Sequence, residues 1–556
     1  MKFRILPLGF AVALISLHAA PADRVASASS GKNPDPGDLV LFPLDDVSLP
    51  WRDNLKVTLQ QPVKFPGNPV FRAGPVEGPD GYGPLIYGTV IKEAGKFRMW
   101  YLASPRADDR IPGDAEAMVH DFRPIAYAES ADGIRWNRPD LGLVEFRGNK
   151  HNNLVAVEPQ TDPYAKFIHD FVAVIRDDAD PDASRRYKMA FITRDVPTRS
   201  ASTGTAASPD GLRWTLANTT MFTKGQFENS SLIKFKGLYY VAGQNVPPFD
   251  SGVEDGSYAG RVMKVFFSPD FHHWSGSRAL SFYRSAYIPT WKHFGQEDHM
   301  GAGLWNRGNV ILGYYGQWHG NTLRSKPHPE NPYLGASAQG LTGLEIDLGM
   351  VISNDAIHYR EPVRNFVAVH HGTADEWDYP AVLQSNGFAN TATQTLIWYS
   401  HWNTNAPDML PALPAPLPPE LARHPYGVGL LTLPRDRFGY FSKLLAVSGA
   451  RNPAIAVTKR DASCLSRSFT LAAASRLSVN VADVSPAAPL QIALVDDAEE
   501  PLPGYTAELT EASLKAPVRW AGGSETVPAA TAFRVKITWP VAVGDAKLYA
   551  VYLEHP

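Results

Sequence analysis

The stretch Ser130-Ala131-Asp132-Gly133-Ile134-Arg135-Trp136 returns as Ser208-Pro209-Asp210-Gly211-Leu212-Arg213-Trp214, and this repeat decides the predicted fold. A third copy spans 268–274, a weaker fourth spans 353–359, and residues 435–441 keep an Asp and a late aromatic. Ser and Asp side chains bond to the backbone in tight turns, and Gly supplies a positive φ. Each copy therefore indicates a turn, and its aromatic residue is expected to pack between neighbouring sheets.

Apolar alternating runs precede the copies, at 97–101, 187–191, 238–242, 310–315 and 395–399. The late aromatics of successive copies lie 60 to 85 residues apart, which leaves room for about four strands in each unit. We therefore predict an all-β chain whose residues 39–445 form a five-bladed β-propeller. Ordinary hairpins in a β-sandwich are the alternative, although sandwiches do not usually repeat one turn chemistry at this spacing.

Short alternating strands at 477–481, 490–495, 533–539 and 548–553 follow the last copy, separated by Pro, Ala and Asp turns. This pattern predicts a C-terminal β-sandwich over residues 446–556. The sandwich is expected to brace the propeller, and glycan binding is the alternative.

The first residues, Met1-Lys2-Phe3-Arg4, precede a short apolar run and small residues that offer cleavage after Ala22 or Ala28. This pattern predicts a signal peptide over 1–28, and residues 29–38 form a polar linker. We expect export to the periplasm or the medium, with no transmembrane segment after cleavage. An N-terminal anchor is the alternative, but the run is too short to span a bilayer comfortably.

The chain has 556 residues and a formal net charge of −3, so no basic field exists to hold nucleic acid. Its one cysteine, Cys464, excludes an intrachain disulfide and a structural metal site built from cysteines. No histidine pair has metal-ligand spacing with a third partner, so we expect no metal site and no cofactor. A Ca²⁺ or Na⁺ ion on the propeller axis stays open as an alternative. The sequence does not determine the oligomeric state.

Candidate catalytic residues lie in the segments before the apolar runs, where the innermost strands of a propeller converge. Carboxylates occur at equivalent points of four units, as Asp170, Glu228, Asp298 and the pair Glu376 and Asp378. Like charges on one axis raise each other's pKa, and glycoside hydrolysis needs one protonated and one ionised carboxyl group. The alternative is that these residues form turns or cap strands at the rim.

Four further polar or aromatic residues belong to the same segments: His169, Asn229, His299 and Trp377. With Asp378, they are the predicted substrate-binding residues. A histidine there could orient a carboxylate, donate to a sugar hydroxyl, serve as acid or base, or be satisfied by a backbone group. Trp377 could stack on a sugar face or pack between units.

A family resemblance is carried by the motifs Tyr87-Gly88-Thr89-Val90, Tyr127-Ala128-Glu129-Ser130, Glu376-Trp377-Asp378 and residues 97–101, 130–136 and 185–189. In these motifs the chain resembles exported bacterial proteins that are similar to the N-terminal domain of glycoside hydrolase family 32. The resemblance covers most of the chain, including 477–481 and 503–505 near the end. Across the five-bladed propeller glycosidases (families 32, 43, 62, 68 and 117), it implies a base or nucleophile, a pKa modulator and a Glu acid on the first three blades. By position, Asp170 matches the modulator and Glu228 matches the acid.

The first blade departs from that pattern, because Tyr87-Gly88-Thr89 stands where an Asp is implied. The nearest carboxylates are Glu77 and Asp80 in the preceding loop, so Glu77, Asp80 or Asp298 is expected to supply the base or nucleophile. The Asn-Asp-Pro-Asn-Gly signature of fructan-cleaving members is absent, and sucrose or fructan specificity is therefore not carried over.

These observations favour an exported glycoside hydrolase that cleaves environmental oligo- or polysaccharides with a carboxylate acid/base pair on the propeller axis. The first alternative is a non-catalytic carbohydrate-binding propeller, since the blade-one acid is missing. The second is a sialidase-like enzyme, since the turns resemble Asp boxes, although sialidases are implied to have six blades. The sugar, its linkage and the choice between retention and inversion do not follow from the sequence.

Overall fold

The computed structural model describes residues 39–105, 123–158, 171–195, 200–218, 227–245, 261–284, 297–319, 345–402, 426–444, 460–471 and 473–554. These residues form strands and loops, with one short 3-10 turn at Ala183–Arg185, so the predicted all-β class is confirmed. Within these ranges, no helix is long and apolar enough to cross a membrane. The predicted signal peptide (1–28), the linker (29–38), His169 and Asp170 lie outside the described residues.

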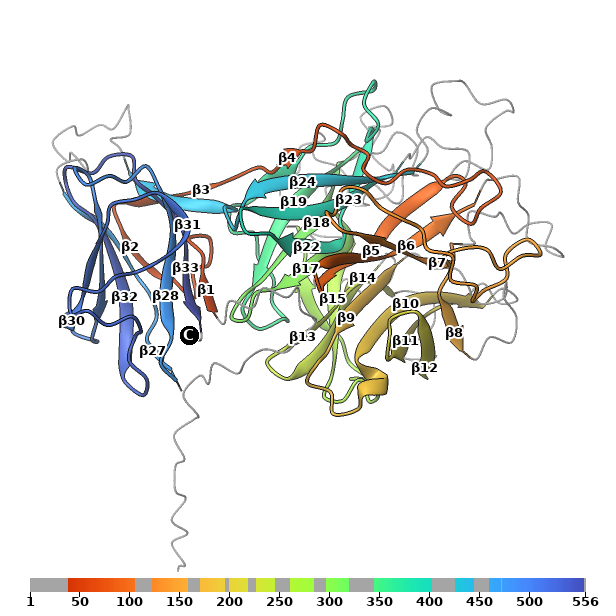
Figure 1. The fold of residues 1–556 in the computed structure, drawn as a ribbon, viewed down its shortest axis with the longest axis horizontal. Coiled ribbons are helices and arrows are strands. Elements are labelled where there is room, and N and C mark those ends of the chain that lie inside the picture. Colours follow the sequence, from red (N-terminus) through yellow and green to blue (C-terminus); the bar gives the residue numbers. More distant parts are fainter. Residues whose placement is uncertain are drawn as a thin grey trace, which may run out of the picture.

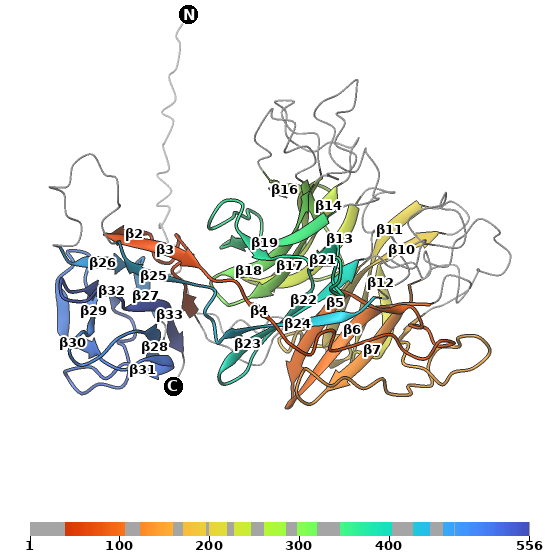
Figure 2. The ribbon, with the colours of Figure 1, turned by 90° about the horizontal axis from the view of Figure 1, so that it is seen from above.

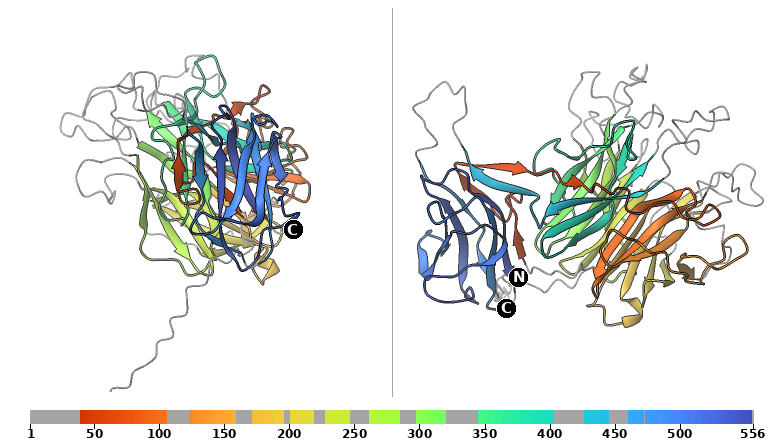
Figure 3. Two further views of the ribbon diagram at one scale, coloured as in Figure 1. Left: turned by 90° about the vertical axis from the view of Figure 1, so that its left-hand side faces the viewer. Right: turned by 45° about the horizontal axis from the view of Figure 1, so that its top comes forward.

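The described strands form two bodies that lie beside each other (Figure 1). The terminal body consists of strands from residues 39–59 and 439–554, and the main body consists of strands from residues 63–434. The red segment from β3 to β4 passes from the terminal body to the main body (Figure 2). Two further views show the same side-by-side arrangement (Figure 3).

The described strands of the main body form three sheets of four, five and twelve strands. By their order along the chain these mainly antiparallel strands divide into five groups, of which groups one, four and five share the twelve-stranded sheet. Group one has β5 (Gly83–Glu93), β6 (Lys96–Ser104) and β7 (Ile125–Ser130); group two has β8 (Ala156–Glu158), β9 (Val172–Arg176), β10 (Tyr187–Asp195), β11 (Ser200–Ser208) and β12 (Arg213–Asn218); group three has β13 (Phe227–Phe235), β14 (Leu238–Asn245), β15 (Val262–Ser268) and β16 (Ala279–Phe282). Group four has β17 (Glu297–Asn306), β18 (Ile311–His319), β19 (Glu345–Ser353) and β20 (Val367–Val369); group five has β21 (Ala381–Leu383), β22 (Asn386–Asn390), β23 (Gln394–Trp402), β24 (Val428–Pro434) and β4 (Val63–Lys64).

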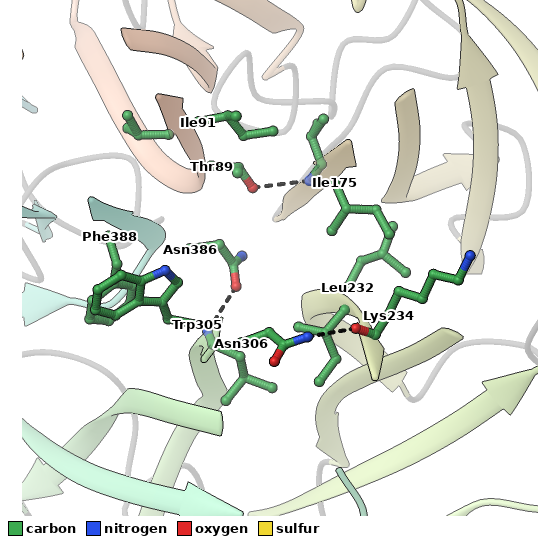
Figure 4. Close-up of a pocket in the computed structure, with 13 residues that line it drawn as sticks. Thr89, Ile91, Ile175, Leu232, Lys234, Trp305, Asn306, Asn386 and Phe388 are labelled. Carbon is green, nitrogen blue, oxygen red and sulfur yellow. Dashed lines mark hydrogen bonds between the residues drawn. The ribbon is translucent and has the colours of Figure 1, made fainter. Parts of the chain in front are cut away.

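One strand from each group, β5, β9, β13, β17 and β22, lines a common cavity (Figure 4). Each of these inner strands packs against the next, and β22 also pairs with β5 in parallel. Polar side chains bridge the inner strands: the Val174 N–H donates to Thr89 Oγ1 at 3.0 Å, and the Leu304 N–H donates to Asn386 Oδ1 at 2.9 Å. The inner strands therefore bring residues from all five groups toward one axis.

The terminal body is built from two sheets around a shared apolar core that includes Leu477, Ile537 and Trp539. One sheet contains β1 (Leu39–Leu41), β3 (Leu55–Leu59), β25 (Gly439–Lys443), β28 (Arg476–Ala482), β31 (Ser513–Pro517) and β33 (Lys547–Glu554); the other contains β2 (Trp51–Asp53), β26 (Ala462–Leu465), β27 (Phe469–Thr470), β29 (Leu490–Val495), β30 (Pro501–Leu509) and β32 (Ala532–Trp539). Residues 39–59 belong to the range predicted for the propeller (39–445) but pair here: β1 with β33, β2 with β26 and β3 with β25.

The repeated phrase forms the predicted turn. Ser130 Oγ accepts the Gly133 N–H at 2.8 Å, and Asp132 Oδ1 accepts the N–H groups of Ile134 and Arg135 at 2.9 and 2.8 Å. The same bonds recur at 208–213, 268–273 and 353–358. The fifth position differs, because Asp436 is buried and instead accepts from Asn390 Nδ2 and Tyr552 Oη, each at 3.0 Å.

Two of these turns accept a hydrogen bond from a tryptophan of a neighbouring group. Trp100 on β6 donates its indole N–H to the Gly211 carbonyl at 2.7 Å, and Trp398 on β23 donates to the Gly133 carbonyl at 2.9 Å. The ring of Trp136 lies 6.0 Å from that of Trp398, so aromatic packing between groups is confirmed at this turn. The turns therefore also connect one strand group to the next through hydrogen bonds and ring contacts.

Replacing Gly211 with Ala is expected to destabilise the protein by about 2–4 kcal/mol, because the new Cβ is strained by the positive φ and overlaps a neighbouring side chain. The φ of Gly211 is +78°, and its Cβ would lie 2.7 Å from Trp100 Cζ2. The control is Gly237→Ala, where φ is +87° but nothing lies within 4 Å, so a loss of about 1–2 kcal/mol is expected. Urea unfolding measures both, and equal losses would show that the contact with Trp100 is unimportant.

Candidate functional site

Bulges at the beginnings of three inner strands turn polar side chains toward one another. The bulges lie between Leu85 and Thr89 in β5, between Asn229 and Ser231 in β13, and between His299 and Ala302 in β17. An extra residue in a strand re-aims the neighbouring side chains, and such bulges are common beside functional sites. Tyr87, Glu228 and His299 each lie within or directly beside one of these bulges.

His299 is the centre of a buried hydrogen-bond network. Its Nε2 lies 2.9 Å from Tyr87 Oη, and its Nδ1 lies 3.2 Å from Arg261 Nη1. A guanidinium group can only donate hydrogen bonds, so Nδ1 must be the acceptor. The neutral imidazole then carries its proton on Nε2 and donates it to Tyr87.

Burial and the nearby Arg261 charge lower the pKa of His299 well below its ordinary value. His299 is 3% exposed, and its ring stacks on Trp402 at 5.3 Å and lies 5.0 Å from the Trp318 ring. Because the imidazole stays neutral near pH 7, this environment favours an orienting role for His299 over a role as a proton-exchanging acid or base.

Gln244 on β14 connects this network to Glu228. Its Oε1 accepts from Arg261 Nη1 at 3.2 Å and from the Met300 backbone N–H at 2.8 Å. Its Nε2 donates to Glu228 Oε2. The hydrogen bonds therefore run without a break from Tyr87 in group one to Glu228 in group three.

Glu228 and Asp298 occupy equivalent places, as the second residues of β13 and β17. Each lies opposite a glutamine of the following strand, Gln244 and Gln317. Glu228 is partly exposed, whereas Asp298 is fully buried. Asn229, next to Glu228, is also buried, and its Nδ2 donates to the Ala190 carbonyl at 3.5 Å. This arrangement offers an accessible carboxyl group with a second carboxyl group on the adjacent inner strand.

The two candidate carboxylates in the loop before β5, Glu77 and Asp80, have different surroundings. Glu77 is exposed and paired with Arg147 at the surface. Asp80 is fully buried, and its Oδ2 accepts from Tyr101 Oη at 2.9 Å and from Arg138 Nε at 2.7 Å. Neither is joined to the His299 network by the contacts of the described residues.

The predicted residues of the fifth unit lie in the loop before β21. Asp378 is buried, and its Oδ2 contacts Lys64 Nζ at 2.7 Å and accepts from Tyr399 Oη at 2.8 Å. Trp377 packs on the rings of Tyr399 and His401 at 5.6 and 5.8 Å. Glu376 is exposed, and the Thr373 backbone N–H donates to it at 2.6 Å. These contacts brace group five.

Sequence reasoning missed Gln244, Arg261 and Gln384. Gln384 Nε2 donates to the carbonyls of His299 and Gly301, both at 2.7 Å, and so holds the β17 bulge. A signal for Gln244 was available, because Gly-Gln ends two apolar runs, at 243–244 and 316–317. In the part of the chain that the structure describes, no cluster of three or more His, Cys, Asp or Glu side chains could hold a metal ion.

Comparisons with known proteins do not assign the chain to a family. No protein-family model matches it. Two uncharacterized proteins from two strains of Mycobacterium tuberculosis are each 29% identical over 175 residues, which cover 30% of this chain and 46% of the relative. The match thus spans less than half the length of these curated relatives.

The similar solved structures include a glycosyl hydrolase from Bacteroides ovatus, with a TM-score of 0.41 and 14% identity over 67% of this chain and 94% of the other. A glycoside hydrolase family 43 arabinoxylan arabinofuranohydrolase from Bacillus subtilis has a TM-score of 0.35 and 11% identity over 89% and 99% of the two chains. Both TM-scores are below 0.5, so neither similarity assigns a function to this chain.

Replacing His299 with Gln is expected to reduce the pH dependence of stability between pH 7.5 and 5.5. In the wild type, the unfolded His299 binds a proton below about pH 6.5 while the folded one stays neutral, so stability falls as the pH falls. The His299 contribution at pH 5.5 is about 1 kcal/mol.

Urea unfolding at the two pH values measures this change. His272→Gln, at an exposed turn, is the control and should keep the wild-type pH dependence. Identical pH dependence in His299→Gln and the wild type would show that His299 ionises in the folded protein.

Proposed function

We propose that the chain is an exported glycoside hydrolase that acts on oligo- or polysaccharides, with Glu228 as its general acid. The observation that carries this proposal is the partly exposed carboxyl group of Glu228, held by Gln244 at the beginning of an inner strand. Asp298 supplies a second carboxyl group at the equivalent place of the next inner strand. Two carboxyl groups in different environments are what glycoside hydrolysis requires.

The main body is proposed to be a five-bladed β-propeller, with groups one to five as its blades and the terminal body as a β-sandwich accessory domain. The cavity lined by one strand from each group supports this architecture. The pairing of β4 with β24 also supports it, since a strand from the beginning of the main body completes the last group. Five groups, rather than six, favour this hydrolase over a sialidase-like enzyme.

In the proposed reaction, Glu228 gives its proton to the glycosidic oxygen as the bond to the anomeric carbon breaks. A second carboxylate either takes a proton from the attacking water or forms a glycosyl-enzyme that water then hydrolyses. Asp298 is a better candidate than Glu77 or Asp80 for this role, because Glu77 pairs with Arg147 at the surface and Asp80 is held by Arg138. Asp170 remains the proposed pKa modulator by resemblance.

The second candidate function is a carbohydrate-binding protein without catalysis. One observation favours it: the bulge of β5 holds Tyr87, whose phenol bonds to His299, where the resemblance implies an acid. Under this alternative the same network would bind a sugar, and no bond would be cleaved.

Replacing Glu228 with Gln is expected to lower kcat by about 10²–10⁴-fold with an unchanged thermal unfolding midpoint, since only the transferable proton is lost. The assay is a panel of chromogenic glycosides with plant and algal polysaccharides, applied to the purified mature protein. Glu77→Gln, at the surface, is the control and should keep wild-type turnover. An unchanged rate in Glu228→Gln would refute the assignment, and sugar binding without turnover in the wild type would favour the second candidate.

A further inference from the structure

The carboxamide of Gln244 has a single defined orientation. The side chain is 1% exposed, and the backbone N–H of Met300 donates to its Oε1 at 2.8 Å. Because a backbone N–H can only donate, this contact identifies the oxygen and places the amide nitrogen toward Glu228 Oε2. The nitrogen also lies 2.8 Å from Met300 Sδ.

The surroundings keep this orientation rigid. Met300 has a φ of 64° within the β17 bulge, and Gln384 holds the carbonyls on either side of it. Arg261 donates to Gln244 Oε1 and lies over the Trp318 ring at 4.4 Å. A permanent cation on the amide oxygen polarises the amide, which strengthens the hydrogen bond that its nitrogen donates.

We infer that Gln244 is the positioning residue of the general acid: it occupies Oε2 of Glu228 and so directs the transferable proton to Oε1. This inference rests on the proposed function. Gln244 does not meet the reacting atoms and acts through Glu228. A hydrogen bond donated to a carboxylate favours its ionised form, so Gln244 also helps to determine the pH at which Glu228 loses its proton.

Other charged and titratable groups belong to the hydrogen-bond network around Gln244 or to strands beside it. They are Arg261 before β15, Lys264 on β15, Asp298 and His299 on β17, and Tyr87 on β5. The substitutions described below leave these groups in place. Gln244→Glu adds a carboxyl group beside Glu228, and like charges raise each other's pKa, so Gln244→Leu is the variant whose displaced pH profile reports the lost bond between Gln244 and Glu228.

The neighbouring group supplies a matched control residue. Gln317 lies opposite Asp298 as Gln244 lies opposite Glu228, and it is also fully buried. Its amide nitrogen, however, donates to Tyr315 Oη at 3.1 Å and to the Phe366 carbonyl at 3.0 Å. Substitution of Gln317 therefore removes a buried amide of the same kind that holds no carboxylate.

The experiment compares pH profiles of kcat/KM for the wild type, Gln244→Glu, Gln244→Leu and Gln317→Leu. Gln244→Glu keeps an acceptor for Met300 and Arg261 but removes the amide donor, so it is the variant expected to fold. Both Gln244 variants should move the basic limb to higher pH by about one unit, with kcat at pH 7 lowered about tenfold or more. Gln317→Leu should lower stability and leave the basic limb in place.

A basic limb at the wild-type pH in folded Gln244→Glu would overturn the inference, as would an equal displacement in Gln317→Leu. A measurement that does not need turnover distinguishes a wrong role for Gln244 from a wrong assignment of the protein as a hydrolase. The titration of the Glu228 carboxyl group can be followed by infrared difference spectra, with Glu228→Gln as the reference. The titration of Glu228 should move to higher pH in Gln244→Glu. A titration at the wild-type pH would overturn the inference even if the protein only binds sugar.

Discussion

The hydrogen bond from a tryptophan indole to the carbonyl of a turn glycine links strand groups at two boundaries of the main body. It joins Trp100 to Gly211 and Trp398 to Gly133, and in each case it crosses from one strand group to another. Side-chain bonds within the turn aim that carbonyl, and a glycine is needed because a Cβ would strike the indole. A local turn thereby determines how neighbouring groups are placed.

Buried ion pairs also connect neighbouring strand groups. Glu93 in group one accepts from Arg98 at 2.6 Å and from Arg176 of group two at 2.8 Å, and Lys234 of group three reaches Asp177 of group two at 2.9 Å. Such pairs lose hydration on burial, so their net contribution to stability is small. Breaking one leaves an uncompensated charge, which disfavours other placements of the groups. With the groups held in this way, the inner strands converge and their bulges bring Tyr87 and Glu228 into one network.

The candidate site was partly predictable from residues that interrupt apolar segments. Glu228 and His299 were predicted because a carboxylate or an imidazole is unusual in an otherwise apolar strand. Gln244 and Arg261 did not stand out, since their roles depend on partners from other strands. Asp378 shows the opposite case: its local sequence resembled that of a site residue, but Lys64, more than 300 residues earlier, contacts its carboxylate.

The sequence by itself determined the all-β class, the turns and the repeated units, because these follow from bonds between residues two or three positions apart and from the alternation of apolar side chains. Tertiary structure decided that residues 39–59 pair with strands near the end of the chain, as in β1 with β33. It also decided that Tyr87, Gln244, Arg261 and His299 form one network with Glu228. Local periodicity carries no information about such distant partners, since strand pairing and bulge geometry alone bring them within hydrogen-bond distance.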